Sequence, residues 1–337
     1  MESARSTPRP LVWVILLGVL GLVLFSITPL SVFAWIWQKL SVFSTVFLGI
    51  FIEAVPYLLL GTLASGLVEV FLDRKWMMRF APNRGLSAAF AGALMGLAFP
   101  VCECGVIPLT RRLYQKGLPL PAGIAFLLAA PVLNPIVILS TASAFGWGRM
   151  LAWRLGLTLA MAVVIGLVFS VEKDSSRILR PLPPVLHSHE HVAAPESSTH
   201  TFGNKVQQAL LIAADEFVEM GRYLVFGAML AAAMQTFISQ STLLAIGSGP
   251  LLSVLVMLAL AFILSICSTV DAFVALGFVG TFSFGAILSF LTFGPMVDIK
   301  SLLMYRQVFK KRVVGYLVLL PFLMALLAGL AFNYLFL

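Results

Sequence analysis

The sequence predicts an all-α polytopic membrane protein with two homologous repeats, inverted relative to each other, and one additional N-terminal transmembrane helix. Three observations support this fold class. Of the 337 residues, 60% are hydrophobic and only 11% are charged. Apolar stretches of about 20 residues, the length that crosses a bilayer as a helix, follow one another along the chain. A set of residues in the first half also recurs in the second half at a nearly constant separation.

The composition excludes a water-soluble protein of this size, because a soluble surface needs a larger share of charged residues. The formal net charge is +8, but the basic residues lie in short loops between apolar segments. This pattern is typical of a multi-pass protein of the plasma (inner) membrane, so we expect no nucleic-acid partner. The three cysteines all lie in apolar stretches and do not indicate the disulfide framework of a secreted protein.

The first apolar segment, residues 11–30, resembles a signal peptide because arginines precede it. Its apolar run is longer than a signal-peptide core, and no small-residue cleavage site follows, so we interpret it as a retained anchor. Residues 1–40 are therefore expected to form an N-terminal tail and a first transmembrane helix. The further apolar segments are residues 41–72, 85–108, 118–147, 150–171, 207–240, 251–277, 283–303 and 313–337.

A polar segment, residues 172–206, separates a first membrane repeat (41–171) from a second (207–337). It is rich in proline, serine and charge, so it cannot bury enough apolar surface to fold alone, and we expect a cytoplasmic linker. All four histidines lie in it: His187, His189, His191 and His200. Alternate histidines in an extended chain can gather around a metal ion, although a solvated polar linker explains them equally well.

The evidence for duplication is a set of recurring residues. Phe51, Glu53, Tyr57 and Gly61 recur as Phe217, Glu219, Tyr223 and Gly227 at a separation of 166, Cys102 as Cys267 at 165, and Pro131 and Asn134 as Pro295 and Asp298 at 164. Chance resemblance between apolar sequences would scatter these separations. We therefore predict two related halves.

The basic residues predict the orientation of the halves. They flank both ends of residues 85–108, which places both ends in the cytoplasm if the segment is a broken, re-entrant hairpin. The first half then has three full crossings, and this odd number inverts the second half, as in known transporter designs. Residues 239–250 would lie outside, and Arg149 and Arg154 would be exceptions at the outer end of their hairpin. The alternative is nine plain helices.

The strongest local signal is residues 99–108, where prolines and a glycine surround a Cys-x-Cys pair. Pro100, Gly105 and Pro108 are expected to break the helix and free backbone carbonyls. Two thiols one residue apart, Cys102 and Cys104, can converge on one soft ion, and Glu103 would supply an oxygen ligand or a proton acceptor. A carboxylate within a membrane segment is a candidate functional group. The alternative is that the cysteines act as small hydrophobic residues.

The matching segment of the second half contains Cys267, several hydroxyl groups and Asp271. If the halves face each other, Cys102, Cys104 and Cys267 could form a site with three thiols. Pro131, Pro135 and Pro295 are further expected breaks. Beside them Asn134 and Asp298 are candidates for substrate or ion contact, or for hydrogen bonds between helices. Glu53 and Glu219 correspond in the two halves; Glu219 could instead pair with Arg222, one turn away.

Residues 99–108, Leu118-Pro119-Leu120 with residues 130–135, and residues 267–273 resemble motifs of a known family. From about residue 47 to residue 336 the chain is similar to the predicted permeases that include the ArsP-type organoarsenical efflux permeases. The resemblance implies an inner-membrane permease, and some members export trivalent organoarsenicals. The matching residues are Cys102, Cys104, Gly105, Pro131, Asn134, Pro135, Cys267 and Asp271. Glu103 stands where a small residue is expected, and with the His-rich linker it favours a divalent metal such as zinc.

We therefore expect a permease that exports a thiophilic metal or metalloid, a trivalent organoarsenical or a zinc-like ion, through a cysteine-containing site between the repeats. The sequence has no Walker-type phosphate loop, which favours ion or proton coupling. We expect no enzymatic activity and no cofactor. The expected partners are the lipid bilayer, the metal or metalloid ion, a soluble or lipid-anchored accessory subunit, and a second copy of the chain.

Two alternatives stay open. The chain could be the membrane subunit of a multi-component permease complex, in which its basic loops dock the accessory protein. It could also be a membrane redox enzyme that uses Cys102 and Cys104 as a dithiol, although their spacing is not the reactive Cys-x-x-Cys form.

Overall fold

A computed structural model describes residues 30–73, 85–99, 101–171, 178–180, 202–237 and 249–335. In these ranges the chain is helical and forms no strand, apart from isolated bridges. The first half contains α2 (Leu30–Phe71), α4 (Gly85–Leu94), the 3₁₀ helix η1 (Met95–Leu97), α5 (Glu103–Gln115), α6 (Leu120–Leu133), α7 (Pro135–Phe145) and α8 (Arg149–Phe169). The second half contains α9 (Phe202–Phe237), α11 (Pro250–Leu264), α12 (Asp271–Leu276), α13 (Phe284–Phe293), α14 (Ile299–Val308) and α15 (Lys311–Leu335).

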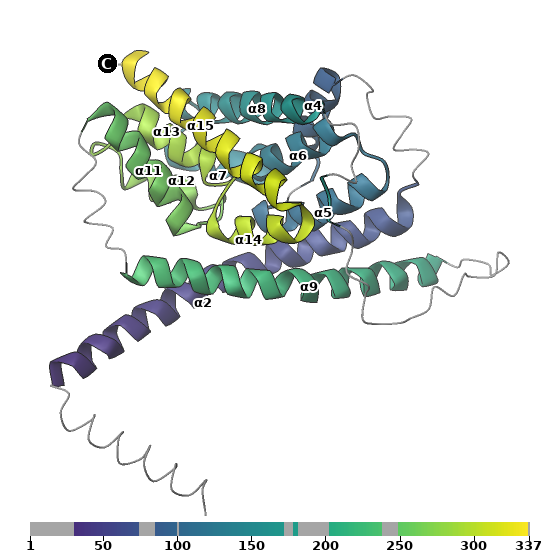
Figure 1. The fold of residues 1–337 in the computed structure, drawn as a ribbon, viewed down its shortest axis with the longest axis horizontal. Coiled ribbons are helices and arrows are strands. Elements are labelled where there is room, and N and C mark those ends of the chain that lie inside the picture. Colours follow the sequence, from purple (N-terminus) through teal and green to yellow (C-terminus); the bar gives the residue numbers. More distant parts are fainter. Residues whose placement is uncertain are drawn as a thin grey trace, which may run out of the picture.

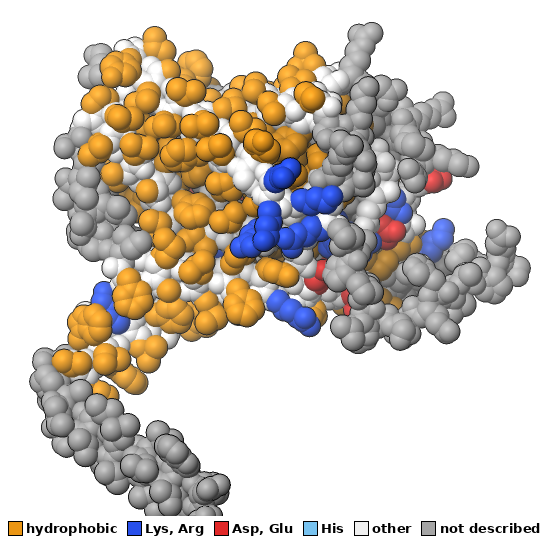
Figure 2. Space-filling model, in the orientation of Figure 1, with side chains coloured by type: hydrophobic (Ala, Val, Ile, Leu, Met, Phe, Trp, Pro, Cys, Tyr) orange, Lys and Arg blue, Asp and Glu red, His pale blue; other side chains and the backbone are white. Residues whose placement is uncertain are grey.

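The long apolar helices confirm a multi-pass helical membrane protein. In the described ranges α2, α8, α9 and α15 are each long and apolar enough to cross a bilayer, and α6 and α7 make a further crossing if the pair, bent by 41°, counts as one span. Large hydrophobic side chains such as Ile52 and Leu327 are exposed on these helices, as lipid contact requires. Figure 2 shows hydrophobic side chains over much of one face, with the charged side chains gathered together rather than scattered.

The order of elements is the same in the two halves. Each begins with a long helix, continues with a shorter apolar helix, and reaches an irregular break at residues 98–102 or 265–270. A helix follows the break (α5 or α12), then two helices that are separated by a break at Asn134 or before Asp298 (α6 and α7, or α13 and α14), and a final long helix completes each half. The duplication and the inversion of the second half both stay predictions.

Helices α2 and α9 lie side by side beneath the other helices and cross the whole body of the protein (Figure 1). With 42 residues, α2 is about 63 Å long, about twice the hydrocarbon thickness of a bilayer. Its N-terminal part extends away from the body in Figure 1, and most of residues 32–49 are exposed. The C-terminal part of α2 therefore packs against the core, while the N-terminal part contacts few other elements.

Two expected boundaries fall inside helices. The boundary at residue 40 lies within α2, because residues 31–48 contain neither glycine nor proline to interrupt the helix. Helix α9 begins at Phe202, four residues before the expected end of the linker at residue 206. Most of the expected N-terminal tail and first transmembrane segment, residues 1–29, lies outside the described residues.

The predicted helix breaks were partly wrong. Gly105 and Pro108 lie inside α5, and Pro131 lies inside α6. The dense packing of these buried helices outweighs the one backbone hydrogen bond that each proline removes. Pro135 begins α7, where its missing N–H costs nothing, and Pro295 lies in the turn between α13 and α14. Pro100 lies outside the described residues.

Gly105 has a different role, because it allows two helices to cross closely. A β-carbon added at Gly61 on α2 would overlap the backbone of Gly105 on α5. The matching glycine of the second half, Gly227 on α9, lies against Lys300 on α14, where an added β-carbon would be 2.9 Å from the Lys300 Cα. These two crossings hold α5 and α14 against the paired long helices.

Candidate functional site

The first break is formed by residues 98–102 between η1 and α5. Phe99 precedes a proline, and the proline ring disfavours helical dihedrals at the residue before it. Cys102 is the extended N-cap of α5, so Glu103 is the first residue of this helix. The side chains of the Cys-x-Cys pair and of Glu103 are all buried. The sequence prediction of a broken helix at this position is confirmed.

The second break begins at Ser265, which ends α11 in the left-handed conformation (φ 50°, ψ 41°). A residue other than glycine adopts this conformation at a cost of about 1 kcal/mol. The Ser265 hydroxyl donates a hydrogen bond of 2.6 Å to Oδ2 of Asp298, which offsets that cost. Cys267 follows in the irregular segment before α12.

The third break ends at Asp298, the N-cap of α14. Its Oδ1 accepts a hydrogen bond of 2.6 Å from the backbone N–H of Ser301, and the Ser301 hydroxyl oxygen accepts one of 2.9 Å from the backbone N–H of Asp298, which completes a capping box. Asp298 is also buried. The Asp298 carboxylate therefore accepts two short hydrogen bonds, one from Ser265 of the second break and one from Ser301 in the first turn of α14. These two bonds fix its position.

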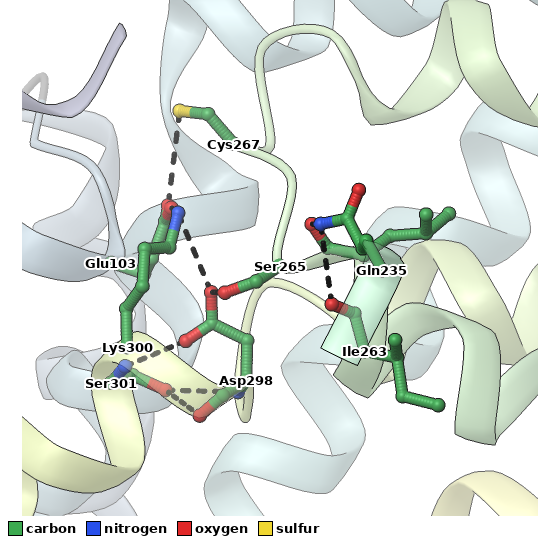
Figure 3. A network of polar contacts seen from close by, with 9 residues as sticks. Glu103, Gln235, Ile263, Ser265, Cys267, Asp298, Lys300 and Ser301 are labelled. Atoms are coloured by element: carbon green, nitrogen blue, oxygen red, sulfur yellow. Dashed lines mark hydrogen bonds and ion pairs between the residues drawn. The ribbon is translucent and has the colours of Figure 1, made fainter. Parts of the chain in front are cut away.

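These three breaks meet and bring charged groups and the Cys267 thiol together inside the protein (Figure 3). Lys300 Nζ is 3.5 Å from Oε1 of Glu103 and 3.5 Å from Oδ2 of Asp298. The Cys267 thiol points at Oε2 of Glu103 at 3.9 Å. We call Cys102, Glu103, Cys104, Cys267, Asp298 and Lys300 the charged thiol cluster. Each of these six residues is at most 2% exposed.

The Cys102 thiol of the first half lies next to the Cys267 thiol of the second half. Cys102 interacts with both Cys104 and Cys267, and all three are free thiols. In the ranges that the structure describes, however, no group of three or more His, Cys, Asp and Glu side chains is arranged to hold a metal ion. The thiols are thus close together but do not form a preformed metal cage.

Asp271 takes part in a separate buried ion pair. Arg154 Nη2 on α8 is 2.6 Å from Oδ2 of Asp271 on α12, and Arg154 Nη1 donates to the Thr141 hydroxyl at 2.8 Å. Arg154 is fully buried in the second turn of α8, so it is an interior residue rather than a loop charge, while the side of the membrane on which this end of the hairpin lies stays a prediction. The pair ties α8 of the first half to α12 of the second half.

Asn134 acts within the first half. Its side-chain oxygen accepts a hydrogen bond of 2.9 Å from the N–H of Ile136 and caps α7, and its amide donates to the Val101 carbonyl at 3.4 Å. It therefore connects the break before α7 to the break before α5. Asn134 and Asp298 cap corresponding helices, but only Asp298 lies in the charged thiol cluster.

The two predicted glutamates differ in their surroundings. Glu53 on α2 interacts electrostatically with Lys300, and its buried Oε1 has no hydrogen-bond partner in the part of the chain that the structure describes. Glu219 on α9 pairs with Arg111 at 3.6 Å and accepts a hydrogen bond from Gln307, rather than forming the predicted pair with Arg222. Glu53 thus lies beside the cluster, and Glu219 lies apart from it.

Glu219 belongs to an ion-pair network at the C-terminal end of α5. In this network Arg112 pairs with Glu216 on α9 and, at 3.8 Å, with Glu69 on α2, and Lys116 pairs with Glu69 at 3.4 Å. Because α5 begins at the charged thiol cluster and ends in this network, one short helix connects the two groups. The basic residues at the end of α5 therefore form ion pairs with α2 and α9, in addition to predicting the orientation of the chain in the membrane.

Sequence reasoning missed three residues of the site: Lys300, Arg154 and Ser265. A signal existed for Lys300, since it follows Asp298 by two residues within an apolar segment, and an ionisable residue in such a segment is a candidate functional group. Arg154 had the same signal but was interpreted as a loop charge. Ser265 gave no signal, because its role depends on a left-handed backbone. The four histidines lie outside the described residues.

Comparisons with known proteins agree on one family. The family described as "Predicted permease" matches residues 39–334. The chain is 46% identical to the UPF0718 protein YcgR of Bacillus subtilis over 288 residues, which cover 85% of this chain and 95% of the relative. It is 38% identical over 270 residues to a Streptococcus mutans protein, covering 79% of this chain and 87% of that protein, whose provisional name is two-component membrane permease complex subunit. No solved structure matches the chain.

Proposed function

Because this chain belongs to the predicted permease family that matches residues 39–334, we propose that it exports a thiophilic metal or metalloid across the inner membrane. The substrate is a trivalent organoarsenical or a zinc-like ion. It contacts the charged thiol cluster on its way between the two halves. Transport is coupled to an ion or a proton, and the chain acts as a transporter rather than as a dithiol redox enzyme.

The observation that carries this proposal is the meeting of thiols from both halves around a buried carboxylate. Cys102 and Cys104 come from the first half and Cys267 from the second, and Glu103 lies next to all of them. Thiols bind soft ions and trivalent arsenicals. Buried ionisable groups at helix breaks are costly in a membrane protein and are typical of transport sites.

The lack of a preformed metal cage in the described ranges agrees with transport. A permeating ion has to leave its site again, so binding must be weak enough for release. A cage of three or four fixed ligands would instead retain the ion as a structural zinc site does. Two or three thiols that close on the substrate only in one state of the transport cycle satisfy both requirements.

The test is metal and metalloid accumulation in cells that express the chain. Cells are challenged separately with zinc and with a trivalent methylarsenical, and the cell-associated element is measured by mass spectrometry. Expression of the wild type is expected to lower the accumulation of one of them. The Cys102→Ser/Cys104→Ser and Cys267→Ser variants are expected to lose this effect.

A matched control is Met161→Leu, which removes a different buried sulfur atom from α8, about two helical turns from Arg154. This variant should keep the wild-type effect. All variants are compared at equal amounts in the membrane fraction. Accumulation that is the same in the wild type, the cysteine variants and cells without the protein would refute the proposal.

A second candidate function is that of one subunit in a permease complex. The observation in its favour is the name of the Streptococcus mutans relative. Purification of the tagged chain in mild detergent from its own host tests this. A companion at a one-to-one ratio would support the complex, while purification of the chain alone in an active form would refute it.

A further inference from the structure

Lys300 is the only basic residue among the six residues of the charged thiol cluster. Its ammonium group lies beside the two carboxylates, where a bound cation would otherwise lie. Its ammonium group lies 3.5 Å from each of two carboxylates, Glu103 and Asp298, and it also interacts electrostatically with Cys104 and Cys267. The lysine side chain is 2% exposed. Two buried carboxylates require a nearby positive charge, and this protein supplies that charge itself.

The position of Lys300 is fixed by helix packing. Gly227 of α9 lies against the start of the lysine side chain, since a β-carbon there would be 2.9 Å from its Cα and 3.4 Å from its Cγ. Lys300 is also the second residue of α14, a helix whose N-cap is Asp298. The ammonium group is therefore held beside the thiols by the structure of two helices.

Comparison of the two halves shows that the pair of Glu103 and Lys300 is an addition to the shared framework. At a separation of 165, the second-half counterpart of Glu103 is Ser268, and at a separation of 164, the first-half counterpart of Lys300 is Ile136. Helix α7, with Ile136, and helix α12, which follows Ser268, form without these charges. The charged pair thus serves the site rather than the fold.

A fixed ammonium group beside the thiols affects charged and uncharged substrates differently. A divalent cation that approaches the thiols meets a like charge in an environment of low dielectric constant, where such repulsion is strong. An uncharged trivalent arsenical brings no charge. Its As–OH bond and the S–H bond of a thiol break, an S–As bond forms, and the hydroxyl group leaves with the thiol proton as water.

We propose that Lys300 is a specificity-determining residue that admits uncharged trivalent thiophiles to the cysteine site and excludes divalent cations. This inference rests on the proposed function, because it assumes that the thiols bind the substrate. It chooses between the two substrate classes that the thiols alone leave open.

The test measures binding to the purified chain in lipid nanodiscs. Phenylarsine oxide and Cd²⁺ are the probes, and bound arsenic or cadmium per chain is determined by mass spectrometry. The wild type is expected to bind phenylarsine oxide through its cysteines and cadmium only weakly. Lys300→Gln should bind cadmium roughly tenfold more tightly or better, because a like charge beside the thiols has been removed, and should still bind phenylarsine oxide.

Two controls test whether the effect depends on the positive charge at position 300. One replaces the lysine side chain but keeps its charge, and the other removes a positive charge elsewhere in the chain. Lys300→Arg keeps the positive charge and should keep the wild-type preference. Lys39→Gln removes a lysine of α2 that donates to the Thr236 carbonyl and should also leave the preference unchanged. If Lys300→Gln does not fold, Glu103→Gln/Lys300→Gln removes one charge of each sign, and cadmium binding should still rise above that of the wild type.

Each outcome decides one of the two proposals. Cadmium binding by the wild type that is as tight as in Lys300→Gln would overturn the inference and leave the thiol site intact. Cadmium binding that stays weak in every Lys300 variant, with cysteine-dependent arsenical binding retained, would also overturn it. If the wild type binds neither probe through its cysteines, the proposed function itself fails.

Discussion

At the scale of single residues, the ion pair of Arg154 and Asp271 has the largest predicted effect on stability. Both side chains are almost completely buried, so removing one partner leaves an unpaired charge inside the protein, at a cost of about 3–5 kcal/mol. Arg154→Met and Asp271→Leu are each expected to lower the unfolding midpoint in detergent strongly. The double variant should recover much of the loss, because it leaves no unpaired charge.

Thr141→Val is the matched control, since it removes the hydroxyl that accepts from Arg154 and donates to the Val137 carbonyl but leaves both charges paired, and it should cost only about 2 kcal/mol. Additive losses in the Arg154→Met/Asp271→Leu variant would contradict this account. They would mean that the two side chains stabilise the protein independently of each other.

Asp298 combines two roles that substitutions can separate. Asp298→Asn keeps an oxygen that accepts from the Ser301 N–H and so retains the helix cap, whereas Asp298→Ala loses the cap at a further cost of about 1 kcal/mol. Asn134, which caps the corresponding helix α7 as an amide, shows that asparagine suits this position. Unfolding of the two variants in detergent measures the difference, and equal stability would show that the cap contributes nothing.

At the scale of helices, close packing depends on small residues where helices cross. Gly61→Ala is expected to destabilise the protein by several kcal/mol, because the new β-carbon would overlap the Gly105 backbone and push α5 away from α2. The shift would also move Glu103, so substrate binding should weaken in parallel. Thermal unfolding and arsenic binding on the same preparation measure both effects.

Gly49 on the same helix provides the control. An added β-carbon there meets nothing within 4 Å, so Gly49→Ala should be neutral or stabilise the helix by up to about 1 kcal/mol. A similar loss of stability in both variants would show that the effect comes from helix propensity or lipid contact rather than from the crossing with α5.

At the scale of the whole molecule, the basic loops predict an inverted arrangement of the two halves. The segments that follow the first long helix of each half correspond to each other: residues 74–84 are expected in the cytoplasm and residues 239–250 outside, because the first contains basic residues and the second contains none. Reporter fusions at these two segments, with one enzyme active only inside and one active only outside, test the orientation. Finding both segments on the same side would refute the inversion and leave the order of helices unaffected.

The fold class and the positions of most breaks could be predicted from the sequence. Hydropathy showed the membrane helices, and the recurring residues located Cys102 with Cys267 and Asn134 with Asp298 at corresponding breaks. Individual prolines were less informative, since Pro108 and Pro131 lie inside helices. Burial against neighbouring helices compensates for the lost hydrogen bond, and this burial cannot be predicted from the residues around the proline.

The sequence by itself determined that this is a membrane protein with intramembrane thiols, because hydrophobicity and residue type are local properties of the chain. Only the tertiary structure decided which charges meet those thiols. Lys300 reaches Glu103 across a sequence separation of 197 residues, and Arg154 reaches Asp271 across 117. Such pairs depend on how the breaks of the two halves pack together, and no local pattern specifies the partner of a buried charge.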